Sequence, residues 1–260
     1  MNEMIWTESV KQDKYVALVK ERDKLRKEAF QWRQEYIRVF GAQILAVFEK
    51  KLECIKKKKM IAYCQAAINR GEAIDQAALQ AYLAGEMKEY HRQLKEMVKE
   101  NEQAQSKGEV TQAELMKIKK IYHRIAKRIH PDIYPHTQDE PVLMELWIRT
   151  VAAYSGNDLD TLIECETLIN KALDELGIGN GLIDIPDIEE KISALQEEII
   201  EIRETDPYQY KYLLEDEDAV KEKKEDLEGE LRSYEEYDDE LETLLETVMG
   251  NGGVIAWQMN

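Results

Sequence analysis

The stretch of residues 118–132, in the middle of the chain, reads Ile-Lys-Lys-Ile-Tyr-His-Arg-Ile-Ala-Lys-Arg-Ile-His-Pro-Asp. Its apolar residues recur three or four positions apart, which is the spacing of one face of an α-helix. That face carries Ile118, Tyr122, Ile125 and Ile129. Basic residues line another face of the same helix: Lys117, Lys120, Arg124, Lys127 and Arg128. The pattern predicts an amphipathic helix that buries its apolar face against other helices.

Both ends of this helix can be predicted. Thr111 and Glu114 have the spacing of a capping box, in which each side chain accepts a hydrogen bond from the other residue's backbone N–H group. Pro131 disfavours a helical conformation at the residue before it, so we expect the helix to span 112–129. Further helices are expected from about Asp139 through Tyr154, and over 159–175.

His130, Pro131 and Asp132 follow the basic helix directly. Proline fixes the backbone of the loop, and the Asp132 carboxylate can accept charge-assisted hydrogen bonds. The basic face would attract an acidic partner and raise the association rate. Residues 117–128 contain six basic residues and no acidic one, in a chain whose formal net charge is −17. This local reversal of charge indicates a binding surface.

Long helices are expected before this central stretch. Residues 11–69 contain no proline and one glycine, Gly41, and their apolar residues recur at helical spacing. They predict a long amphipathic helix, with any bend expected near Gly41. A second helix over 76–104, capped by Asp75, is expected to fold back on the first as a hairpin, because a lone apolar stripe must be buried.

The carboxyl-terminal part has two apolar seams of heptad type, over 188–202 and 220–248. A short connection separates them, so they predict an antiparallel coiled-coil hairpin. Asp238 stands at a seam position where an apolar residue is expected. The predicted all-α organisation has a long-helix hairpin over 1–84, a central helical segment over 85–178, an acidic coiled-coil hairpin over 182–249 and a tail over 250–260.

Charge is unevenly distributed along the 260 residues, since 1–135 carry a net charge of +8 and 136–260 one of −25. The overall excess of acid argues against nucleic-acid binding by the whole protein, because such binding needs cations that displace counterions. The three cysteines form no C-x-x-C pair, so they suggest neither a disulfide framework nor a zinc ribbon. No apolar run approaches 18 residues. We therefore expect a cytoplasmic protein without membrane segment, metal or other cofactor.

The stretch 118–132 resembles the second helix and loop of a J-domain, the defining module of DnaJ-like co-chaperones. The family pattern has a Tyr eight residues before the His, an aliphatic residue and an Ala soon after that Tyr, interleaved basic residues, and then His-Pro-Asp. Tyr122, Ile125 and Ala126 match it. Trp147 and Tyr154 resemble the aromatic residues of the third J-domain helix.

The resemblance covers about residues 112–155, and the preceding helix at 85–104 would serve as the first J-domain helix. The sequence has no Gly/Phe-rich linker, no Cys-rich zinc module and no β-rich client-binding half. In this respect it is similar to the divergent J-proteins that share only the J-domain, and to bacterial J-domain proteins of unknown client.

The resemblance implies a co-chaperone that is not itself an enzyme. In the family, the His-Pro-Asp loop and the basic face of the second helix dock on an ATP-bound, DnaK-like heat-shock chaperone of seventy kilodaltons and trigger its ATP hydrolysis. The chaperone-binding residues would be His130, Pro131, Asp132, Lys117, Lys120, Arg124, Lys127 and Arg128. The core of the J-fold would be Tyr122, Ile125, Ala126, Trp147 and Tyr154. The expected partners are a DnaK-like chaperone and a client that the sequence does not identify, and the coiled-coil segments allow a homo-oligomer.

Other interpretations stay open. The chief alternative is a helical scaffold or oligomerisation protein whose J-like fold no longer engages a chaperone. A weaker one is a nucleic-acid-associated factor that uses basic residues at 50–59 and 117–128. Metal binding by His123 and His130 is disfavoured, because seven helical residues separate them by about 10 Å. Acid–base catalysis by His130 and Asp132 is disfavoured because no nucleophile motif or phosphate loop accompanies them.

Overall fold

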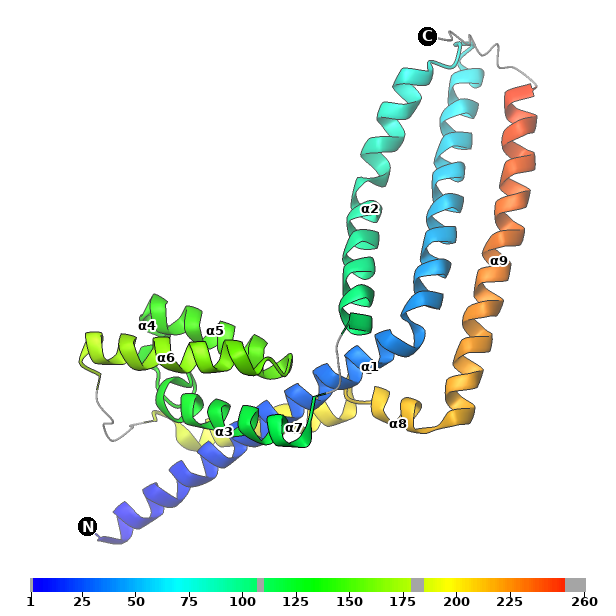
Figure 1. Ribbon diagram of the computed structural model, residues 1–260. Coiled ribbons are helices and arrows are strands. Elements are labelled where there is room, and N and C mark those ends of the chain that lie inside the picture. Colours follow the sequence, from blue (N-terminus) through cyan, green and yellow to red (C-terminus); the bar gives the residue numbers. More distant parts are fainter. Residues whose placement is uncertain (1, 107–109, 179–184, 251–260) are drawn as a thin grey trace. The chain divides into compact units, whose positions relative to one another are not determined.

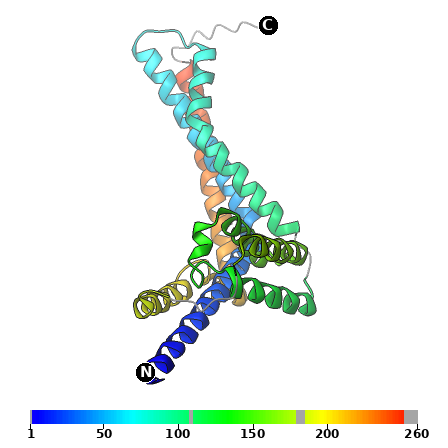
Figure 2. The same ribbon diagram turned by 90° about the vertical axis from the view of Figure 1, so that its left-hand side faces the viewer.

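The computed structural model describes residues 2–106, 110–178 and 185–250, with side chains from residue 10 onward (Figures 1 and 2). Every secondary-structure element in these ranges is an α-helix, which confirms the predicted all-α class. The helices are α1 (Asn2–Asn69), α2 (Gln76–Ser106), α3 (Gln112–Ile129), α4 (His136–Asp139), α5 (Pro141–Ser155), α6 (Leu159–Leu176), α7 (Ile188–Glu204), α8 (Tyr210–Glu215) and α9 (Glu217–Gly250). None of these described helices is both long and apolar enough to cross a membrane.

The chain forms two compact units, and α1 contributes to both. The first unit comprises residues 1–33 and 108–211, and the second comprises 34–107 and 212–260. The helix α1 stays continuous through Gly41. At this point α2 lies so close that a Cβ on residue 41 would collide with the Asn101 side chain.

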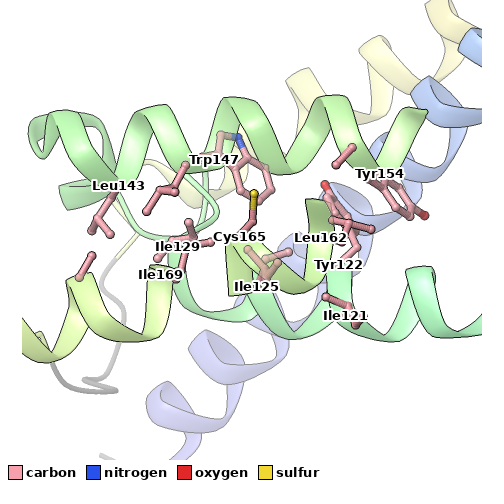
Figure 3. Packing of buried hydrophobic residues seen from close by; sticks show 14 of the residues in the cluster. Ile121, Tyr122, Ile125, Ile129, Leu143, Trp147, Tyr154, Leu162, Cys165 and Ile169 are labelled. Atoms are coloured by element: carbon pink, nitrogen blue, oxygen red, sulfur yellow. The ribbon is translucent and has the colours of Figure 1, made fainter. Parts of the chain in front are cut away.

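In the first unit, α3, α5 and α6 pack around one apolar core (Figure 3). The predicted capping box begins α3: Thr111 Oγ1 accepts the Glu114 N–H at 3.3 Å, and Glu114 Oε2 accepts the Thr111 N–H at 3.0 Å. Pro141 stands in the first turn of α5, and Asp158 caps α6. The largest fully buried side chains of this core are Ile118, Ile125, Ile129, Leu143, Leu162 and Ile169. Burial of each such side chain stabilises the unit by about 1.5 to 3 kcal/mol.

A second apolar cluster of the first unit joins α1 to α7 and to the segment after α3. Tyr15 and Val19 of α1 pack with Ile133, and with Ile192 and Leu195 of α7. The amino-terminal part of α1 therefore lies between α7 and the loop that contains the His-Pro-Asp sequence.

In the second unit, residues 34–69 of α1 lie beside α2 and α9 (Figures 1 and 2). Asp75 caps α2, since its Oδ1 accepts the N–H group of Ala77 at 2.8 Å. The return of α2 along α1 is held by an ion pair of 2.6 Å between Lys59 and Glu86. From the other side, α9 contributes Leu227 to a cluster with aromatic and aliphatic residues of α1.

Asp238 interrupts the apolar seam of α9 for a structural reason. It is 7% exposed, and its carboxylate pairs with two lysines of α1, Lys50 at 3.0 Å and Lys57 at 2.9 Å. Burial by itself would raise the pKa of Asp238, but the hydrogen bonds and charges of the two lysines lower it. A single polar match of this kind favours one register of α9 along α1.

The division of the chain differs from the prediction in two places. The sequence predicts that 188–202 and 220–248 pair as one coiled-coil hairpin, but α7 belongs to the first unit and α9 to the second, and each covers a different part of α1. Residues 85–106, expected to serve the central segment, lie in α2 of the second unit. An apolar seam shows that a helix has a partner but does not identify it, and α1 is long enough to serve both.

Candidate functional site

The His-Pro-Asp sequence forms a tight loop at the carboxyl end of α3. The carbonyl of His130 accepts the N–H groups of Ile133 at 2.9 Å and Tyr134 at 2.7 Å. The backbone N–H of Asp132 donates to His130 Nδ1 at 3.1 Å. Pro131 is buried and has no N–H to satisfy. These bonds within the loop hold its backbone in one conformation.

His130 is an interior residue, with 2% of its surface exposed. Nδ1 accepts the Asp132 N–H, which assigns the ring proton to Nε2; this nitrogen donates to Asp23 Oδ2 at 3.1 Å and also lies 3.3 Å from Arg22 Nη2. The imidazole centroid lies 4.5 Å from that of Trp147. These contacts fix both the orientation and the tautomer of the imidazole.

Asp23 of α1 is the centre of this network. Its Oδ2 also accepts the Tyr122 hydroxyl at 2.6 Å, and its Oδ1 accepts Arg22 Nη2 at 2.9 Å. Burial alone would raise the pKa of Asp23, but the hydrogen bond and electrostatic interaction with His130, the charge of Arg22 and the hydrogen bond from Tyr122 outweigh it and lower the pKa to about 2. The carboxylate is therefore ionised at neutral pH.

The lowered pKa of Asp23 predicts a dependence of stability on pH. The ordinary value is 3.8 and the folded value about 2, so the stabilisation is complete above about pH 4 and is lost as the pH falls towards 2. A shift of this size corresponds to about 2 kcal/mol. Hydrogen exchange of α3 amides at pH 5 and pH 2.5 should show a larger loss of stability in wild type than in Asp23→Asn. An equal loss in both proteins would contradict the assignment.

Asp132 has two contacts with α1. Its Oδ2 lies 2.5 Å from Arg22 Nη1, and its backbone carbonyl accepts the Tyr15 hydroxyl at 3.0 Å. The Asp132 side chain is still 33% exposed, whereas that of Arg22 is 8% exposed. Arg22 therefore bridges Asp23 in the interior and Asp132 at the surface.

A groove of about 460 Å³ runs between α1, the loop and α5, and Asp132 lines it. The α1 wall carries three cationic residues, Arg22, Arg26 and Lys27, beside the buried Asp23, and the α5 wall is apolar, with Met144, Trp147, Ile148 and Val151. Lys27 Nζ lies 3.9 Å from the centroid of the Tyr154 ring, and burial lowers the pKa of Lys27 to about 8. The groove is therefore amphipathic, with the His-Pro-Asp loop between its two walls.

Two residues of the predicted basic face, Arg124 and Arg128, form hydrogen bonds with α6. Arg124 donates to both carboxylate oxygens of Glu166, at 2.6 and 2.8 Å, and Arg128 donates to the amide oxygen of Asn170. The exposed basic residues of α3 are Lys117, Lys119, Lys120, Arg124 and Lys127, whereas Arg128 is half-buried. The lysines thus supply the cationic surface, while the two arginines also hold α6 against α3.

The five residues predicted as the core of a J-fold are buried together in the core of the first unit: Tyr122, Ile125, Ala126, Trp147 and Tyr154. The rings of Tyr122 and Tyr154 are stacked, with centroids 3.8 Å apart and planes at 9°. The Trp147 ring lies 5.9 Å from that of Tyr122. Figure 3 shows the Tyr122, Trp147 and Tyr154 side chains together in this core, and Trp147 also packs on the His130 ring.

Sequence reasoning missed the contribution of α1 to the site, namely Arg22, Asp23 and Tyr15. One signal was present, because two adjacent charged residues stand where the apolar stripe through Tyr15, Val19 and Leu25 would continue. Charged residues at buried helix positions need partners. The stripe alone could not show that these partners lie more than 100 residues further along the chain.

Comparison with known proteins finds no family model, no curated protein and no solved structure that matches this chain. Among the residues that the structure describes, no three His, Cys, Asp or Glu side chains are grouped so that they could hold a metal ion.

Proposed function

We propose that the chain is a co-chaperone that binds a DnaK-like heat-shock chaperone of seventy kilodaltons and stimulates its ATP hydrolysis. The observation that carries the proposal is the combination of an exposed lysine face on α3 with a conformationally fixed His-Pro-Asp loop at the end of the same helix. Neither part needs a catalytic group, so the chain acts by docking. The proposal includes a cytoplasmic location, where the free thiols of Cys54, Cys64 and Cys165 stay reduced.

Each residue has a distinct task in this proposal. Lys117, Lys120 and Lys127 attract an acidic surface of the chaperone and orient the encounter. Asp132 then receives a cationic side chain of the chaperone, since its carboxylate lines the groove. His130 does not contact the partner, because it is buried; it keeps the Asp132 backbone in place through Nδ1.

Single-turnover ATP hydrolysis by a DnaK-like chaperone tests the proposal. Wild-type protein is expected to raise the hydrolysis rate by about tenfold or more, which corresponds to about 1.4 kcal/mol of barrier. Asp132→Asn and His130→Gln are expected to return the rate to that of the chaperone alone, and circular dichroism should show unchanged helicity.

Lys171→Gln provides the control. Lys171 is an exposed basic residue of α6 that pairs with Glu175 at the surface, and it belongs to neither α3 nor the loop. This variant should stimulate like wild type. Failure of wild-type protein to stimulate hydrolysis at any concentration would rule the function out.

One observation favours the alternative of a scaffold that no longer engages a chaperone. Arg22 already occupies Asp132, and His130 is 2% exposed. A scaffold would leave the chaperone's rate unchanged and would self-associate through its long helices. Light scattering across a concentration series tests this alternative, which requires an oligomer.

A further inference from the structure

Arg22 has two carboxylates within reach at the edge of the groove. Its Nη1 lies 2.5 Å from Asp132 Oδ2 and 3.7 Å from Glu198 Oε2 of α7. Glu198 is held beside it, because the other carboxylate oxygen of Glu198 pairs with Arg26. One guanidinium edge therefore faces two competing acceptors on different elements of the first unit.

The rest of Arg22 is fixed independently of this competition. Its Nη2 donates to Asp23 Oδ1 at 2.9 Å, and Asp23 is in turn held by His130 and Tyr122. Arg22 can thus exchange its partner at Nη1 while its contact with Asp23 stays in place. Only the end of one side chain needs to move, and α1 keeps its position on the loop.

The Nη1 contact matters because Asp132 is the accessible acidic group of the groove: its side chain is 33% exposed, whereas Asp23, which also lines the groove, is buried. A carboxylate oxygen engaged by a buried guanidinium at 2.5 Å is less available to a second cation. The Asp132 side chain is nevertheless 33% exposed, so a cation that enters the groove can reach it.

We propose that Arg22 is an autoinhibitory gate. In the free protein its Nη1 pairs with Asp132, and it pairs with Glu198 instead when a cationic side chain of the chaperone binds Asp132. This gate rests on the proposed function, since it regulates the same site. Glu198 is the acceptor that keeps the displaced guanidinium paired, which a buried charge requires. Docking then competes with one internal ion pair.

The gate is tested by titrating this protein against the chaperone and measuring ATP hydrolysis. The quantity compared between variants is the concentration of this protein that gives half-maximal stimulation. Arg22→Gln frees Asp132 and is expected to lower this concentration about three- to fivefold, the value of one ion pair. Glu198→Gln removes the acceptor for the displaced Arg22 guanidinium, so this variant is expected to raise the half-maximal concentration by a similar factor. The double variant should behave like Arg22→Gln, because Glu198 acts only through Arg22.

Two further variants separate the gate from a general effect on folding. Glu189→Gln removes another acidic residue of α7, whose carboxylate pairs with Lys11 of α1 at a distance of 2.5 Å and not with Arg22. This variant should leave the half-maximal concentration unchanged. Arg22→Lys keeps the charge but cannot bridge two carboxylates with a planar fork, so it should lower the concentration like Arg22→Gln. Because His130 is 2% exposed in the folded protein, diethylpyrocarbonate should acylate it slowly. Equally slow acylation in every variant would show that α1 still covers the loop.

The outcomes distinguish the gate from the function on which it rests. If wild type stimulates but both Arg22 variants need as much protein as wild type or more, the gate is wrong and the function stands. Equal effects of Glu189→Gln and Glu198→Gln would also overturn it, since α7 would then act only as a brace. Absence of stimulation in all variants would overturn the proposed function and the gate together.

Discussion

Replacing Asp23 with alanine is expected to lower the free energy of unfolding of the first unit by about 3 to 5 kcal/mol. Asp23 is 9% exposed and accepts hydrogen bonds from Arg22, His130 and Tyr122. Its removal leaves a buried guanidinium with fewer acceptors and two buried donors without a partner, and each unsatisfied group adds a desolvation cost. Hydrogen exchange of the α3 amides measures the change, because these amides report opening of this unit.

Asp13→Ala is the matched control for that variant. Asp13 lies on the same helix and is exposed, so its replacement should change stability by no more than about 0.5 kcal/mol. Similar values for the two variants would show that Asp23 is not the centre of a buried network.

Replacing Trp147 with alanine is expected to destabilise the first unit by about 3 to 5 kcal/mol. Trp147 is 7% exposed, and its ring packs on Tyr122 and on His130. The variant leaves a cavity beneath the loop, so it should also reduce the stimulation of chaperone ATPase. The same hydrogen-exchange measurement reports the loss of stability.

Ile148→Ala serves as control for Trp147→Ala, because Ile148 is the next residue of α5 and is 59% exposed. It should cost less than about 1 kcal/mol, since little apolar surface returns to water. A cost for Trp147→Ala as small as that of Ile148→Ala would contradict the core as described.

Local sequence signals predicted the centre of the first unit well. The capping box at Thr111, the proline after His130 and the three- and four-residue spacing of α3 depend on neighbours in the chain, and α3 spans 112–129 as expected. The burial of Tyr122 and Trp147 follows from the same periodicity.

The partners of the long helices could not be predicted in this way. The apolar seams of α7 and α9 satisfy the same pattern whether they face each other or α1, and the structure has each of them on a different part of α1. Arg22 and Asp23 were missed for the same reason, because their partners His130 and Asp132 lie more than 100 residues away in the chain. Periodicity identifies a buried face, whereas only the tertiary structure assigns its partner.

We propose that the His-Pro-Asp loop and the lysine face of α3 form one docking surface for the chaperone. Hydrogen exchange of the full chain, with and without an ATP-bound DnaK-like chaperone, tests it most directly. Slower exchange is expected at residues 117–134 on addition of the chaperone, and no such change with Asp132→Asn. Protection confined to α2 or α9, or the absence of any protection, would contradict it.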